Sequence, residues 1–205
     1  MSLDILSTAR MTAVMIGNES LLIQCASIWR DAGHSVAAVV TRSADIQVWA
    51  EGEGLRVLSS DSDIAADLAG ESFDWLLSIA NLDMLPQRVL SLPSKGAVNF
   101  HDGPLPRYAG LNAPVWARMA QEARHGITWH KVEAKADTGE IIAQRMFDIS
   151  QTDTALTLNT KCYAAAIESF PEVVTALADD VPNARPQDMS QRSYFGLGKL
   201  PEAAG

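Results

Sequence analysis

The chain has 205 residues, of which 47% are hydrophobic, and this composition supports one large domain with a buried core. Its formal net charge of −9, from 25 acidic residues against 16 lysines and arginines, repels phosphate backbones, so nucleic acid is not expected as a partner. No apolar stretch is long enough to span a membrane, and the first residues lack a secretory signal pattern. Because Cys25 and Cys162 lie far apart, we expect a cytoplasmic protein with reduced thiols, no metal ion and no membrane partner.

The first half of the sequence alternates strand-like and helix-like segments. Apolar, strand-sized runs lie at 11–17, 34–42, 55–59, 73–80 and 96–100, and helical patterns lie between them at 20–33, 44–53, 61–69 and 85–91. Continuous apolar strands separated by helices are typical of a parallel sheet covered on both faces, which predicts a Rossmann-like α/β domain. The first strand ends in Gly17-Asn18-Glu19-Ser20 rather than in a three-glycine turn, so a nicotinamide cofactor is disfavoured.

The pattern of elements changes in the second half. A helix is predicted over 112–123, and strand patterns at 126–134 and 140–150 flank a short loop, which predicts an antiparallel pair. The fold class expected for the whole is therefore α/β. Its central sheet should be mostly parallel, with an antiparallel strand pair at the C-terminal side and helices on both faces.

A long helical stretch over 153–180 follows this strand pair. Pro171 lies inside the stretch and should kink the helix or split it in two, because proline lacks the N–H that a helix needs. The composition then becomes polar and loses its periodicity. We therefore expect one domain over 1–180, and over 181–205 an extended tail or a truncated linker.

The segment 99–110, with the sequence NFHDGPLPRYAG, carries the most chemical information. It begins at the end of an apolar strand, so it should emerge at the carboxyl edge of the sheet, where α/β folds bind their ligands. Asn99 and His101 are two residues apart, so their side chains leave the same face of an extended chain. The amide can donate a hydrogen bond, and the imidazole can exchange a proton near neutral pH.

A second polar element is the turn Asp137-Thr138-Gly139 between the two later strands. Taken alone, Asp137 is more often a turn-forming residue, and His101 alone is more often a structural histidine. The remaining histidines do not have metal-ligand spacing, and we interpret them as structural or surface residues; they are His34, His125 and His130.

Together, NFHDGPLPRYAG and the turn that begins at Asp137 resemble the signature of the folate-dependent formyltransferase family. The resemblance implies a Rossmann-like formyltransferase fold over 1–180 and transfer of a formyl group from 10-formyltetrahydrofolate, as co-substrate, to a primary amine without a metal. It implies that Asn99 donates to the oxyanion of a tetrahedral intermediate and that His101 moves the proton. Asp137 would orient His101, directly or through a water.

The resemblance also implies where the folate binds. Met84 and Leu85 are expected as side-chain contacts, although ordinary core packing is an alternative for both. Backbone groups near the Asp137 turn are expected to contact the pteridine; these are Ala134, Lys135, Ala136 and Gly139.

Asp102 departs from the family pattern, in which a proline commonly follows the histidine. This carboxylate could attract a cationic acceptor, raise the basicity of His101 or cap the loop. Capping is the favoured interpretation because Asp before Gly is a common turn device.

The acceptor amine is the least defined part of the prediction. The acidic charge and the few residues after 180 argue against transfer RNA, and 191–205 resembles formylation domains at the front of modular peptide synthetases. We therefore expect an amino acid or aminoacyl group on a carrier protein as acceptor, with synthetase domains linked downstream; the ending Ala203-Ala204-Gly205 favours a domain boundary. The alternatives are an amino sugar or other small amine, hydrolysis of formyltetrahydrofolate, and a catalytically silent docking domain.

Overall fold

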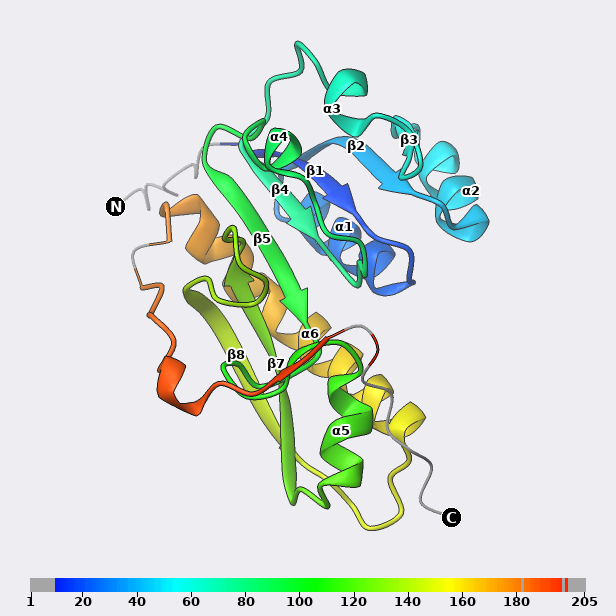
Figure 1. The fold of residues 1–205 in the computed structure, drawn as a ribbon. Helices are drawn as coiled ribbons and strands as arrows, with labels where there is room; N and C mark the ends of the chain where they lie inside the picture. Colours follow the sequence, from blue (N-terminus) through cyan, green and yellow to red (C-terminus); the bar gives the residue numbers. More distant parts are fainter. Residues whose placement is uncertain (1–9, 182, 197, 199–205) are drawn as a thin grey trace, which may run out of the picture.

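A seven-stranded sheet forms the centre of the molecule, in a computed structural model that describes residues 10–181, 183–196 and 198 (Figure 1). The strand order is β3-β2-β1-β4-β5-β7-β8. The strands are β1 (Thr12–Ile16), β2 (Ser35–Thr41), β3 (Val57–Ser59), β4 (Trp75–Ser78), β5 (Gly96–His101), β7 (Arg124–Lys131) and β8 (Ile141–Asp148).

The direction of the strands follows the predicted division of the chain. β1 pairs in parallel with β2 and β4, β2 with β3, and β4 with β5, whereas β7 runs antiparallel to both β5 and β8. The inner parallel strands are apolar on both faces, as a sheet covered on both sides requires. The predicted fold class is confirmed, with a mostly parallel sheet and an antiparallel pair at its C-terminal side.

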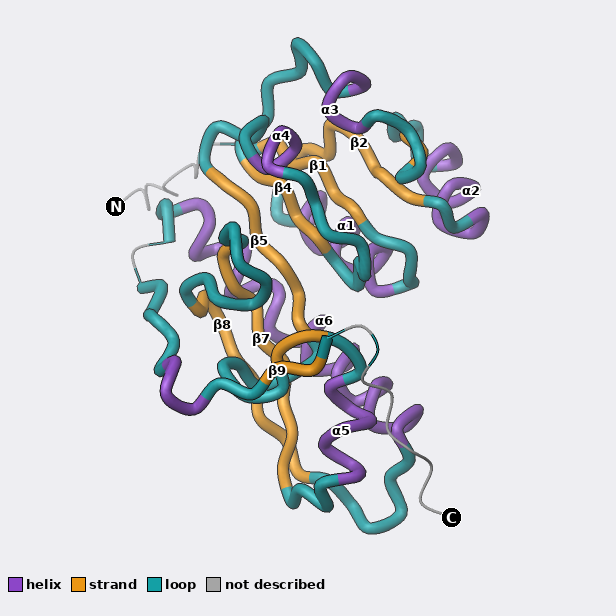
Figure 2. Tube along the Cα trace, in the orientation of Figure 1, coloured by secondary structure: helices purple, strands orange, loops and turns teal. Residues whose placement is uncertain are grey.

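Helices cover both faces of the sheet (Figures 1 and 2). They are α1 (Leu21–Asp31), α2 (Ala44–Gly52), α3 (Ile64–Asp67), α4 (Gln87–Leu90), α5 (Ala113–Met119) and α6 (Ala155–Ala178). One apolar cluster joins the sheet to α1, α2 and α6, and a second joins the other face to α3 and α4. The helices predicted at 61–69, 85–91 and 112–123 are all present but shorter, because their ends form turns.

Pro171 does not split the long helix, so that part of the prediction was wrong. α6 is one continuous helix of 24 residues that contains Pro171. The proline is exposed to solvent, while Phe170, Val173 and Val174 beside it are buried against the sheet. The apolar contacts on the buried side hold the helix together across the one hydrogen bond that the proline cannot make.

Residues 183–196, in the polar segment after Val181, pack against the domain. They contain a short 3-10 helix (Met189–Gln191) and the strand β9 (Tyr194–Phe195), which pairs in parallel with β6 (Ala109–Gly110) (Figure 2). The Phe195 ring stacks on Trp116 with centroids 4.4 Å apart. The predicted boundary at Ala203-Ala204-Gly205 lies outside the described residues.

Within 10–181, 183–196 and 198, no helix combines the length and the hydropathy needed to cross a membrane. The same residues contain no group of three or more histidine, cysteine or acidic side chains arranged to hold a metal ion.

A buried histidine in β7 should make the stability of the fold depend on pH. His125 is fully buried, its Nε2 donates to the Asp102 carbonyl at 2.8 Å, and its Nδ1 has no partner. Burial lowers the pKa of His125 from 6.5 to about 4, although the hydrogen bond to Asp102 opposes this shift. Between these two pH values the unfolded chain binds a proton that the folded chain does not, so stability falls as the pH falls.

We therefore predict that the free energy of unfolding decreases by about 3 kcal/mol through His125 between pH 6.5 and pH 4. Chemical denaturation of the wild type and of His125→Gln across this range measures the difference, because glutamine cannot take up the proton. His34 also has a lowered pKa, so the comparison of the two proteins isolates the contribution of His125. Identical pH dependence in both proteins would refute the prediction.

Candidate active site

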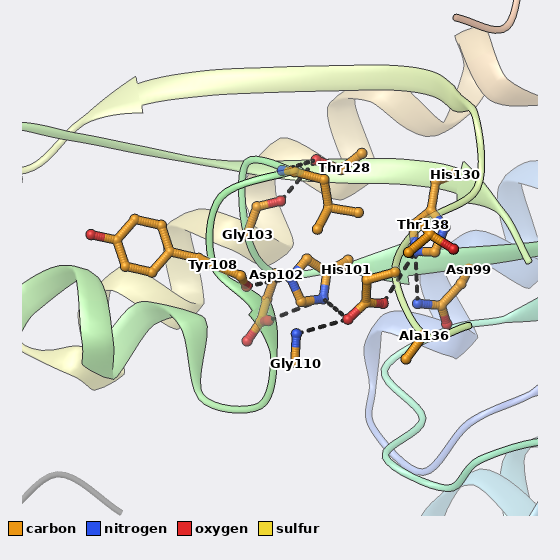
Figure 3. A network of polar contacts seen from close by, with 12 residues as sticks. Asn99, His101, Asp102, Gly103, Tyr108, Gly110, Thr128, His130, Ala136 and Thr138 are labelled. Atoms are coloured by element: carbon orange, nitrogen blue, oxygen red, sulfur yellow. Dashed lines mark hydrogen bonds and ion pairs between the residues drawn. The ribbon is translucent and has the colours of Figure 1, made fainter. Parts of the chain in front are cut away.

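The site lies at the carboxyl end of β5, where the chain leaves the sheet (Figure 3). Asn99 and His101 are both on β5, and Asn99 is the register partner of His130 on the antiparallel strand β7. Side chains of register partners lie on the same face of a sheet. The Asn99 Nδ2 is accordingly 3.3 Å from the His130 Nε2.

The loop after β5 fixes the imidazole of His101. Its Nε2 is 2.8 Å from the Tyr108 carbonyl, which can only accept, so Nε2 carries a proton. In the neutral ring, Nδ1 is then the free acceptor. This Nδ1 is 3.9 Å from the Asp102 Oδ1 and 3.9 Å from the Asp137 Oδ2. Both separations exceed a direct hydrogen bond, so Tyr108 holds the ring and Nδ1 is left for another partner.

The Asp137 carboxylate comes from the turn between β7 and β8 and is 12% exposed. The Gly110 N–H donates to its Oδ2 at 2.8 Å, and the His130 Nε2 lies 3.5 Å from its Oδ1. Burial alone would raise the pKa of Asp137, but the approach of His130, the charge of His101 and the Gly110 N–H together hold this pKa well below its ordinary value. Asp137 is therefore ionised near neutral pH.

Asp102 lies on the other side of the same imidazole nitrogen (Figure 3). Burial raises its pKa, against the charge of His101, and the nearby Asp137 raises it further. Within the part of the chain that the structure describes, no other residue donates a hydrogen bond to this carboxylate. The loop is held instead by Thr128, whose hydroxyl donates to the Gly103 carbonyl at 2.8 Å and accepts from the Leu105 N–H at 3.0 Å. The backbone group that hydrogen-bonds to the Asp102 carboxylate is its own N–H, and the capping role of Asp102 stays a prediction.

The polar groups face a cleft of about 990 Å³. Four of the predicted folate contacts line it, namely Met84, Leu85, Ala134 and Ala136, and it is also lined by Asn99, His101, Asp102, His130, Asp137, Tyr194 and Gly196. Leu82 and Met84 are 82% and 72% exposed, so their side chains are not packed in the core. Exposed apolar side chains beside convergent polar groups are typical of a small-molecule site.

Two of the predicted folate contacts lie outside the lining of the cleft. Gly139 packs so closely that a Cβ would lie 1.8 Å from the Lys131 carbonyl oxygen, so this position needs glycine for backbone packing. The Lys135 carbonyl accepts a hydrogen bond from the Thr138 hydroxyl at 2.8 Å and closes the turn. Both residues shape the turn that presents Asp137.

His130 is the site residue that the sequence did not reveal. Alternation within a strand made it resemble a structural histidine, and the pairing of β5 with β7 was not predicted. The observed register places His130 opposite Asn99, and no local pattern in the sequence indicates that pairing.

Comparisons with known proteins identify the family and the fold. The family model described as formyl transferase matches residues 11–174. The structure of WlaRD, a sugar 3N-formyl transferase solved in the presence of dTDP and 5-N-formyl-THF, is similar with a TM-score of 0.81 and 17% identity, over 93% of this chain and 71% of that one.

Two further solved structures share the fold. An N-formyltransferase from Helicobacter canadensis, in complex with folinic acid and dTDP-3-aminofucose, has a TM-score of 0.79 and 17% identity over 94% of this chain and 72% of that one. Glycinamide ribonucleotide transformylase 1 from Symbiobacterium toebii has a TM-score of 0.77 and 21% identity over 91% of this chain and 97% of that one. At these identities the structures establish the shared fold, and the family model covers most of the chain. The chain belongs to the formyl transferase family.

Proposed function

We propose that this protein transfers the formyl group of 10-formyltetrahydrofolate to a primary amine, with Asn99, His101 and Asp137 as its catalytic residues. The observation that carries the proposal is the convergence of an amide, an imidazole and an ionised carboxylate on one cleft. The cleft volume of about 990 Å³ is sufficient for a folate and an acceptor together. Leu82 and Met84 offer an apolar surface for the folate ring system, and backbone groups of Ala134 and Ala136 offer polar contacts.

Asn99 would stabilise the charge that develops during the reaction. The acceptor nitrogen forms a bond to the formyl carbon, and the carbonyl electron pair moves to the oxygen. The Asn99 Nδ2 would donate to this oxyanion, a contribution of about 10²–10³ in rate for one donor. The oxyanion then collapses, and the bond from the formyl carbon to the folate nitrogen breaks.

His101 would move the proton that must pass from the attacking nitrogen to the leaving nitrogen. Its Nδ1 is the atom available for this transfer, since Nε2 is held by the Tyr108 carbonyl. The 3.9 Å separations leave Nδ1 free to contact substrate or a water. Asp137, which stays ionised, would stabilise the protonated imidazole in the intermediate state.

The charges around the cleft favour an acceptor that places a cationic amine, and no phosphate group, inside the cleft. Its lining includes the acidic residues Glu19, Asp83, Asp102, Glu133 and Asp137. Among its described lining residues, Arg42 is the one arginine or lysine, and it is paired with Asp83. Phosphate groups would be repelled by this lining, whereas an ammonium group would be attracted. The amine of an amino acid, or of an aminoacyl group on a carrier protein of a linked synthetase, fits this requirement.

A screen of amines incubated with the protein and 10-formyltetrahydrofolate tests the proposal, with mass spectrometry of the products. We expect a formylated amino acid or aminoacyl carrier protein. Formylation of a nucleotide-linked amino sugar or of glycinamide ribonucleotide alone would overturn the acceptor while retaining the reaction. Formate release at the same rate with and without amine would indicate a hydrolase, and folate binding without turnover would indicate a docking domain.

Asp102 gives a specific prediction about the acceptor. Replacing Asp102 by Asn should raise the KM for the amine about tenfold, because a charge-assisted hydrogen bond of about 1.5–3 kcal/mol is weakened. The KM for the folate should stay within about twofold of the wild type, because the weakened hydrogen bond is made to the amine and not to the folate. Glu133→Gln is the control, since it removes the same charge from the lining of the cleft. Equal KM values for the amine in wild type and Asp102→Asn would show that Asp102 does not bind the acceptor.

A further inference from the structure

One segment of the chain contacts both loops that carry the catalytic histidine and aspartate. This segment, residues 183–196, is called the strap below. It follows α6 and lies beyond residue 174, where the match to the family model ends. It runs across the Asp137 turn and then along β6, next to the site (Figures 1 and 2).

Two side chains of the strap, Gln187 and Arg192, hydrogen-bond to the Asp137 turn. The Gln187 Nε2 donates to the carbonyls of Asp137 and Gly139 at 3.2 and 2.7 Å. The Arg192 guanidinium donates to the carbonyls of Asp137 and Ala136, both at 3.1 Å. Asp137 has φ of 54°, a left-handed conformation that side-chain-bearing residues rarely adopt. Four hydrogen bonds from two side chains thus fix a turn whose backbone is locally unfavourable.

A third residue of the strap, Ser193, hydrogen-bonds to the loop that orients His101. The Ser193 hydroxyl accepts from the Tyr108 N–H at 2.7 Å, and the Ser193 carbonyl accepts from the Ala109 N–H at 3.0 Å. Tyr108 in turn supplies the carbonyl that holds the His101 Nε2. The strap therefore reaches the imidazole through a single intervening residue.

Gly110 contacts both the Asp137 carboxylate and the strap. Its N–H donates to the Asp137 carboxylate, and its other side packs against Phe195 so tightly that a Cβ would lie 2.2 Å from the Phe195 carbonyl oxygen. Phe195 is anchored by stacking on Trp116. The strap thus contacts both the Asp137 turn and the loop that orients His101, and these two segments together set the distance between Asp137 and His101.

We propose that Arg192 and Gln187 are positioning residues, which hold the Asp137 carboxylate at its working distance from His101 by hydrogen bonding to the carbonyls of the Asp137 turn. The inference rests on the proposed formyl transfer for its kinetic part. Neither side chain needs to touch the substrate for this role. A misplacement of about 1 Å in such a constellation can cost about 10²-fold in rate.

The test uses Arg192→Ala, Gln187→Ala and the double variant. We expect kcat to fall about 10–10²-fold in each single variant, further in the double variant, with the KM values for folate and amine within about twofold. Arg192→Lys should recover part of kcat, because lysine can donate to one carbonyl but cannot reproduce the fork. Arg88→Ala is the matched control, since Arg88 is an exposed arginine that pairs with Asp63.

A second readout does not depend on activity. The amide proton of Gly110 donates to the Asp137 carboxylate, so its NMR shift reports the position of that carboxylate. We expect this shift to move in Arg192→Ala and to stay unchanged in Arg88→Ala. An unchanged kcat in the double variant would overturn the positioning role, as would an unchanged Gly110 shift. If the wild type forms no formylated amine, the proposed reaction fails, and the Gly110 shift still decides whether the strap positions Asp137.

Discussion

Replacing His101 by alanine should lower kcat for formyl transfer by about 10²–10⁴, because the reaction then lacks the group that moves its proton. His101 is 5% exposed, and its Nδ1 lies 3.9 Å from a carboxylate oxygen of Asp102 and 3.9 Å from one of Asp137. The substitution also leaves the Tyr108 carbonyl without its donor, which should lower stability by about 1–3 kcal/mol. Steady-state kinetics with saturating folate and amine measure the loss, and circular dichroism shows that the variant is folded.

The matched control for this prediction is His34→Ala. His34 is also a buried histidine, but it lies just before β2, at the amino end of the parallel strands, whereas the site lies at the carboxyl end of β5. It accepts a hydrogen bond from the Met11 N–H. This variant should lose stability and keep its kcat. If His101→Ala turned over as fast as the control, His101 would not carry the proton.

Replacing Asp137 by asparagine should lower kcat by about 10²–10⁴, because protonated His101 then loses a charge that stabilises it while the Tyr108 carbonyl still holds the ring. Asparagine keeps the shape of the side chain and can still accept from the Gly110 N–H. It lacks the negative charge that would stabilise protonated His101 and that faces His130. Folate binding should persist, because the turn and its hydrogen bonds from the strap are retained.

The charge of Asp137 also sets an expectation for the pH profile of the wild type. Its depressed pKa means that its contribution to stability is present above the ordinary value of about 3.9 and is lost only below it. Protonation of Asp137 should therefore produce no fall in kcat/KM between about pH 5 and 8.

For the Asp137→Asn variant, Asp148→Asn serves as control because Asp148 is an exposed carboxylate paired with Arg124. A kcat in Asp137→Asn equal to that of the control would remove Asp137 from the mechanism.

The sequence predicted the sheet because the signal is local. Apolar runs such as 34–42 and 73–80, separated by helical patterns, are typical of a parallel sheet covered on both faces, and the structure has β2 and β4 there. Asn99 and His101 could be predicted to act together because that signal is also local: a spacing of two within one strand places both side chains on the same face.

Other features could not be predicted because they depend on contacts between distant segments. His130 acquires its place from the β5–β7 register, which no local pattern encodes. The strap is polar and aperiodic, and its order comes from hydrogen bonds to carbonyls that its own sequence cannot specify. The effect of Pro171 was misjudged because helix propensity ignores the buried contacts of the neighbouring residues.

The most direct test of the account is the single-turnover transfer of a labelled formyl group from 10-formyltetrahydrofolate to an amine acceptor, in the wild type and in alanine variants of Asn99, His101 and Asp137. We expect label on the amine with the wild type and a loss of at least about 10² in rate in each variant, with folate still bound. Transfer at the wild-type rate in all three variants would contradict the assignment of the chemistry to these residues.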